Sequence, residues 1–132
     1  MLSPRRFFRS LRHALRGLRE VAHAEHSFRV QLLLGLLAII MSLVLPLSTL
    51  QRVLILLLVA AVLVLEVMNS IVERLIDAVQ PRLNPMVREV KDMMAGTVLL
   101  TSLSALVVGL IIFVPYIWPV LARLKDWLVS VL

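Results

Sequence analysis

The sequence contains no cysteine, and it has few glycine, aromatic and acidic residues. Without cysteine the chain can form no disulfide bond, no thiolate metal site and no thiol nucleophile. Its four glycines do not gather into a glycine-rich phosphate loop. The eight acidic residues are outnumbered by fourteen basic ones, which gives a net charge of +6. These absences exclude thiol chemistry and phosphate binding by a glycine-rich loop.

Apolar residues dominate the 132-residue chain. They make up 61% of it and the mean hydropathy is +0.98, which excludes a soluble domain. We expect an all-α integral-membrane protein that forms one unit over residues 1–132.

The N-terminal segment, residues 4–22, alternates arginines with apolar residues at helical spacing. One predicted helix face carries Phe7, Phe8, Leu11, Leu15, Leu18 and Ala22. The other face carries Arg5, Arg6, Arg9, Arg12, Arg16 and Arg19. This pattern predicts an amphipathic helix on the membrane surface, attracted to anionic lipid headgroups rather than to nucleic acid. We do not expect a signal peptide, because its apolar stretch would follow the basic residues instead of being interleaved with them.

Three longer apolar runs predict three membrane-spanning helices, at about residues 28–46, 50–80 and 86–114. Pro46 is expected to stop the first helix, and Ser48 and Gln51 form a capping-box pattern for the second. The second helix should be about 45 Å long, which exceeds the roughly 30 Å hydrocarbon core, so its last turns should reach headgroups or water. After a break at Pro81, Asn84 is suited to cap the third helix and Pro85 to begin it.

The third helix contains small residues that would allow close helix packing: Gly96, Ser102, Ser104 and Gly109. Pro115 and Pro119 are expected to end or kink it, which leaves residues 117–132 as an amphipathic tail. The N-terminal segment and the 74–91 connection hold ten of the fourteen Lys and Arg residues, whereas the 47–52 connection holds only Arg52. This asymmetry predicts a cytoplasmic N-terminus and an external C-terminus.

The polar residues of the second predicted span form one stripe. At 100° per residue, an arc of about 100° contains Glu66, Asn69, Ser70, Glu73 and Asp77. Glu66 follows directly on an apolar run, where an ionisable side chain is costly and usually marks a functional site or a buried partner. From the residues alone, the stripe could be catalytic or an interhelical packing network. A zinc site is an alternative at Glu25, which lies between His23 and His26, although no third partner is evident.

The spacing of these residues resembles a family signature. The stripe has the pattern Glu66-x-x-Asn69-Ser70-x-x-Glu73-x-x-x-Asp77, and Lys91-Asp92 and Ala95-Gly96 follow it. Upstream come Gly17-Leu18-Arg19 and Glu25-x-x-Phe28-Arg29. In this order the segments resemble the small prokaryotic lipid kinases, namely the diacylglycerol kinases and undecaprenol kinases.

This resemblance implies a role for each residue of the signature. Glu66 would be the general base that takes the proton from a lipid hydroxyl. Glu25 and Glu73 would hold Mg²⁺ together with the phosphates of ATP. The nucleotide would be positioned by Asn69, Asp77, Lys91 and Asp92. Arg29 and Ser70, together with Glu66, would contact the lipid substrate.

The resemblance also implies a homotrimer in the bacterial inner membrane, with its active site on the cytoplasmic side. The expected activity is ATP- and magnesium-dependent phosphorylation of diacylglycerol to phosphatidic acid. One alternative is the phosphorylation of undecaprenol to undecaprenyl phosphate. An alternative from another class is a non-enzymatic membrane protein, such as a transporter or a complex subunit, that uses the acidic stripe for cation passage or helix docking.

Overall fold

The computed structural model describes residues 3–79 and 85–131, and in these two ranges all regular structure is α-helical. The helices are α1 (Pro4–Ala24), α2 (His26–Val44), α3 (Thr49–Val79) and α4 (Pro85–Val131). Three of them, α2, α3 and α4, are long and apolar enough to cross a membrane. The all-helical class and the three candidate spans are therefore confirmed.

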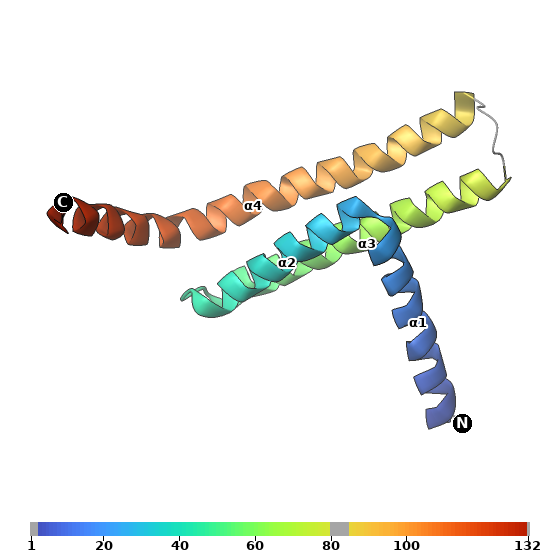
Figure 1. Ribbon diagram of the computed structural model, residues 1–132, viewed down its shortest axis with the longest axis horizontal. Helices are drawn as coiled ribbons and strands as arrows, with labels where there is room; N and C mark the ends of the chain where they lie inside the picture. The colour runs from blue at the N-terminus through green and yellow to red at the C-terminus, as the bar shows by residue number, and fades with distance from the viewer. Residues whose placement is uncertain (1–2, 80–84, 132) are drawn as a thin grey trace.

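Helix α1 leaves the bundle at a sharp corner. The Oγ of Ser3 accepts a hydrogen bond from the backbone N–H of Arg6, which caps the start of α1. The helix ends at Ala24, two residues later than predicted, and α2 begins at His26, so only Glu25 separates them. Figure 1 shows α1 projecting away from the three long helices. Glu25 consequently lies at the corner where α1 meets the bundle.

The connection between α2 and α3 contains the predicted capping box. The N–H of Ser48 donates to Oε1 of Gln51 at 2.8 Å, and the N–H of Gln51 donates to Oγ of Ser48 at 3.3 Å. Helix α2 ends at Val44, before Pro46, and α3 continues without a break from Thr49 to Val79. The predicted turn at Pro81 and cap at Asn84 lie outside the described residues, whereas Pro85 does begin α4.

Helix α3 is the central element, because it contacts each of the other three helices. It lies antiparallel to α4, as two contacts at opposite ends show: Lys91 with Asp77, and the hydroxyl of Tyr116 with Gln51 Oε1 at 3.2 Å. On its other side α3 approaches α2 closely, since a Cβ added at Gly35 would lie 2.8 Å from Cγ1 of Val59. Figure 1 shows the three helices side by side.

Gly96 and Gly109 were predicted to allow close helix packing, but within the chain no other helix packs closely against them. A Cβ at Gly96 or Gly109 would meet no atom within 4 Å, so the close approach occurs at Gly35 instead. Buried apolar side chains gather near the α2–α3 connection, in a cluster of Leu47, Ile55 and Ile112. Most other large apolar side chains of the spans are exposed, which requires a covering of lipid or of other subunits.

Pro115 and Pro119 do not end α4, so of the two effects expected of them, ending or kinking the helix, the first does not occur. Proline removes one helical hydrogen bond, but packing on both sides of it can hold the helix together. Phe113 and Tyr116 both pack against the apolar cluster near the α2–α3 connection, and they flank Pro115. The segment after the prolines, residues 117–131, therefore continues α4, and Figure 1 shows it carrying the C-terminus beyond the α2–α3 connection.

Candidate active site

The predicted polar stripe runs along α3 from a buried end to an exposed end. Glu66 is 4% exposed and Ser70 is 2% exposed. Asn69 and Glu73 are partly buried, and Asp77 is exposed. Asp77 is eleven residues from Glu66, which corresponds to about 16 Å along the helix axis. The stripe thus connects a buried carboxylate in the apolar bundle with a charged, accessible end.

The buried end of the stripe is held by a residue of α2. Nε2 of Gln31 donates a hydrogen bond to Oε2 of Glu66 at 3.3 Å. Gln31 was not predicted as a site residue, although it is a lone amide in the uncharged run from Val30 to Leu47. Such a polar residue inside an apolar span is itself a signal of a polar partner on a neighbouring helix.

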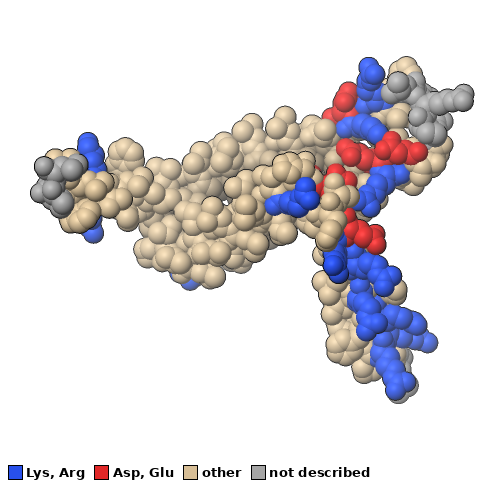
Figure 2. Space-filling model, in the orientation of Figure 1, with Lys and Arg blue, Asp and Glu red and all other residues tan. Residues whose placement is uncertain are grey.

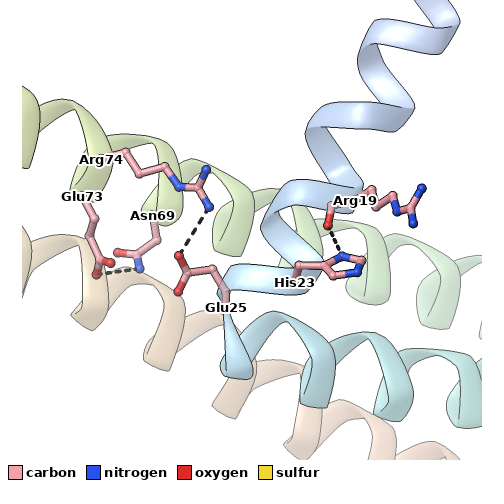
Figure 3. A network of polar contacts seen from close by, with 6 residues as sticks. All are labelled: Arg19, His23, Glu25, Asn69, Glu73 and Arg74. Carbon is pink, nitrogen blue, oxygen red and sulfur yellow. Dashed lines mark hydrogen bonds and ion pairs between the residues drawn. The ribbon is translucent and has the colours of Figure 1, made fainter.

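One turn further along α3, Asn69 and Glu73 are paired (Figure 3). Nδ2 of Asn69 donates to Oε1 of Glu73 at 3.1 Å. Oδ1 of the same amide is buried and has no hydrogen-bond partner. An unpaired buried amide oxygen is unfavourable, and it is a group that a bound cation or a donor could satisfy.

Glu25 reaches this part of α3 from the corner between α1 and α2. Its Oε1 lies 3.8 Å from Nη2 of Arg74, and Figure 3 shows the two side chains pointing toward each other. Arg74 directly follows Glu73, so this ion pair brings Glu25 to the part of the stripe that carries Glu73. The structure therefore gathers three carboxylates that lie as far as 48 positions apart in the sequence. Arg74 was not predicted as a site residue, although it directly follows Glu73 in the signature.

The pair of Glu25 and Arg74 is partly exposed, with 30% and 47% of the two side chains accessible. Partly exposed ion pairs at this separation contribute little to stability. Arg74 can therefore exchange with another cation at Glu25 at small energetic cost.

At the exposed end of the stripe lies Lys91, the basic residue predicted to position ATP. Nζ of Lys91 on α4 contacts Oδ1 of Asp77 at 2.5 Å. Asp92 follows on the exposed surface of α4, and Arg29 is exposed in the first turn of α2. Figure 2 shows that most charged side chains gather at this end of the bundle and along α1, whereas the middle of the bundle is apolar.

The side chains expected at the metal, Glu25 and Glu73, and the neighbouring Asn69 would offer oxygen atoms as ligands. Oxygen-only donor sets suit hard cations such as Mg²⁺, and the unpaired oxygen of Asn69 is consistent with that chemistry. Within residues 3–79 and 85–131, no group of three or more His, Cys, Asp or Glu side chains is arranged as a metal site. Nδ1 of His23 donates to the carbonyl oxygen of Arg19 at 2.8 Å, so this nitrogen already makes a hydrogen bond within α1. Nothing here supports the zinc alternative.

The fold and site together define a multi-helix membrane protein with a carboxylate site at the charged end of its bundle. The family described as prokaryotic diacylglycerol kinase matches residues 12–113. The undecaprenol kinase of Bacillus subtilis (strain 168) is 31% identical over 110 residues, which cover 83% of this chain and 89% of that protein. The chain belongs to the prokaryotic diacylglycerol kinase family, and it is a lipid kinase.

The resemblance based on the signature is thus confirmed. The non-enzymatic alternative is set aside, because the family and the relative are both lipid kinases by name. Residues 114–131, which form the end of α4, lie outside the segment matched by the family.

Proposed function

We propose that this lipid kinase transfers the γ-phosphoryl group of ATP to the hydroxyl group of diacylglycerol, giving phosphatidic acid and ADP. The observation that carries the proposal is the stripe on α3. It places a carboxylate that is only 4% exposed, Glu66, about 16 Å along the helix from the exposed pair of Asp77 and Lys91. A lipid hydroxyl can approach the first from the membrane, and a nucleotide can approach the second from water.

In this proposal Glu66 acts as the general base. Its carboxylate accepts the proton of the lipid hydroxyl while the hydroxyl oxygen bonds to the γ-phosphorus. The bond between that phosphorus and the oxygen bridging to the β-phosphate breaks, and its electron pair leaves with ADP. Phosphoryl transfer of this kind depends mainly on positioning and charge neutralisation. Ser70, which is 2% exposed and one turn from Glu66, contributes to holding the lipid headgroup.

The remaining site residues serve the nucleotide. Glu25 and Glu73, with the unpaired oxygen of Asn69, would hold Mg²⁺, which would neutralise phosphate charge. Lys91 leaves Asp77 to contact a phosphate, since one carboxylate partner can be replaced by a more highly charged one. Asp77 and Asp92 then orient the nucleotide, and Arg29 contacts the lipid or the phosphates from the start of α2.

The distribution of charge supports the proposed location. Lys and Arg side chains gather on α1 and at the α3–α4 end of the bundle (Figure 2). By the positive-inside rule this end faces the cytoplasm of a bacterial inner membrane, where ATP is available. Helix α1 then lies on the inner surface, with its arginines toward anionic headgroups.

Undecaprenol is the second candidate acceptor, because the curated relative at 31% identity is named an undecaprenol kinase. Both lipids present one hydroxyl group to Glu66, so the chemistry at the site is the same. The test is transfer of labelled phosphate from magnesium-ATP to each lipid, alone and in competition, in one detergent. A protein that phosphorylates neither lipid would refute the proposal, and the preferred lipid in competition identifies the acceptor.

We further propose that the working form is a homotrimer whose active sites are shared between chains. Three spans leave most of their large apolar side chains exposed, and they cannot by themselves surround a nucleotide and a lipid headgroup. If Glu66 and Lys91 of one site come from different chains, inactive Glu66→Gln and Lys91→Ala proteins should regain activity when they are mixed and reassembled. Differently tagged chains verify the exchange, and verified mixed trimers that stay inactive would contradict a shared site.

A further inference from the structure

Gln31 is a partly buried polar residue on a helix face that otherwise packs α2 against α3. The buried residues of α2 are Phe28, Gly35 and Ser42, and Gln31 shares their face at helical spacing. Gly35, one turn away, lies against Val59 so closely that an added Cβ would be 2.8 Å from it. An apolar side chain would fill this position without burying polar atoms. The reason for an amide here must therefore be the contacts that the amide makes.

The amide of Gln31 is directed at Glu66. Its Nε2 donates to Oε2 of Glu66 at 3.3 Å, and its Oε1 is buried without a hydrogen-bond partner. An ionised carboxylate can only accept hydrogen bonds, so the donor side of the amide must face it. The chain therefore leaves one amide oxygen unpaired in order to supply Glu66 with a donor, and an unpaired buried oxygen is unfavourable.

The hydrogen bond also distinguishes the two oxygens of Glu66. Oε2 is occupied by Gln31. Among the described residues no hydrogen bond to Oε1 of Glu66 is found, which leaves this oxygen free to accept one from a hydroxyl group. A carboxylate fixed at one oxygen presents the other in a defined direction, which is what proton transfer requires.

We infer that Gln31 is a positioning residue of the kinase: it holds the carboxylate of Glu66 so that Oε1 faces the lipid hydroxyl. This inference rests on the proposed role of Glu66 as general base. Gln31 touches neither substrate in this arrangement, and it acts on the rate only through Glu66. The competing explanation is that Gln31 merely stabilises the contact between α2 and α3.

The experiment measures kcat and the KM values for ATP and for the lipid in Gln31→Met and Gln31→His. Methionine keeps the length of the side chain but has no donor, whereas histidine keeps an N–H. Because a hydrogen bond to a charged group is lost, Gln31→Met should lower kcat by about 10-fold to 100-fold, with the KM for ATP changed by less than about 2-fold. Gln31→His should recover at least about 5-fold of that loss.

A double-mutant cycle separates positioning from stability. Glu66→Asp withdraws the carboxylate by one methylene and so breaks the contact with Gln31. Adding Gln31→Met to Glu66→Asp should then lower kcat by less than about 2-fold, because the interaction is already absent. The matched control is Gln51→Met, which removes the cap of α3 about 22 Å along the axis from Glu66 and should lower the unfolding temperature without lowering kcat.

Two results would overturn the inference while leaving the proposed function intact. One is a wild-type kcat in Gln31→Met, and the other is an equal loss in the wild-type and Glu66→Asp backgrounds. A wild-type protein that transfers no phosphate to either lipid would overturn both. Three results together support the positioning role. Gln31→Met lowers kcat whereas Gln51→Met does not, Gln31→His partly restores kcat, and Gln31→Met has no further effect on kcat in the Glu66→Asp background.

Discussion

Replacing Glu66 by glutamine tests the proposed general base with little change of shape. The side chain is 4% exposed, and the amide has nearly the same volume as the carboxylate, so no cavity forms. The amide oxygen can still accept the hydrogen bond from Gln31 that now reaches Oε2 at 3.3 Å. The substitution also removes a buried charge, which is unfavourable in an apolar bundle. We therefore expect the unfolding temperature of Glu66→Gln to be unchanged or raised.

The effect on the rate should be large. A positioned general base typically contributes about 100-fold to 10,000-fold, which corresponds to about 2.7 to 5.4 kcal/mol of transition-state stabilisation. An amide cannot accept the hydroxyl proton, so Glu66→Gln should lose most of that factor in kcat. Magnesium-ATP binding should persist, because the proposed nucleotide residues Glu73 and Lys91 are unchanged.

The assay combines transfer of labelled phosphate to lipid with direct measurement of magnesium-ATP binding to the same detergent-solubilised protein. Ser42→Ala serves as the control, since Ser42 is also a buried polar residue but donates to the carbonyl oxygen of Ile39 within α2. It should keep a kcat within about 2-fold of wild type. Full turnover of Glu66→Gln across the pH range, or a loss of rate explained wholly by lost nucleotide binding, would refute the assignment.

Three further predictions concern the metal, the nucleotide and the packing. Glu25→Gln and Glu73→Gln should each raise the magnesium concentration needed for half-maximal rate in a magnesium titration. The double variant should show less than the sum of the two effects, because both carboxylates are proposed to bind the same cation. Additive effects would argue for separate sites. Lys91→Ala should raise the KM for ATP about 10-fold or more, because a phosphate contact is lost. The unfolding temperature should stay within a few degrees of wild type, since the ion pair of Lys91 is partly exposed. An unchanged KM would contradict a phosphate contact. Gly35→Ala should lower the free energy of unfolding, measured with denaturant, by about 1 to 3 kcal/mol, because the added Cβ would lie 2.8 Å from a valine of α3. Gly109→Ala should not destabilise the subunit, because its added Cβ would meet no atom within 4 Å in the chain. Equal effects of the two substitutions would refute this packing.

Local sequence patterns predicted the helices well. The capping box of Ser48 and Gln51 forms as expected, and Pro85 begins α4. These features depend on interactions within one turn of helix, so a short stretch of sequence contains all the information needed. Local patterns left open whether Pro115 and Pro119 end or kink α4, and the helix continues through both. Phe113 and Tyr116, which flank Pro115, pack against a cluster that includes Ile55 of α3, and such contacts can support a helix where proline removes a backbone hydrogen bond.

Some residues of the site could be predicted from the sequence and others could not, for a similar reason. Glu66, Asn69, Glu73 and Asp77 could be identified because they share one face of one helix, and the structure keeps them in that stripe. Gln31 and Arg74 were missed as partners, because each acts across a gap between elements. Helical periodicity gives the face of a residue on its own helix but not the side chain that it meets on another.

By itself the sequence determined that this protein is helical and apolar, that ten of its fourteen basic residues lie in the N-terminal segment and around the 74–91 connection, and that one helix carries an acidic stripe. These properties depend on residue type and on the 3.6-residue period, which act within a single segment. Only the tertiary structure decided that Gln31 meets Glu66, that Arg74 meets Glu25 and that α3 is the shared neighbour of the other helices. Such pairings depend on the rotation and register of packed helices, which are set by side-chain contacts such as that of Gly35 with Val59.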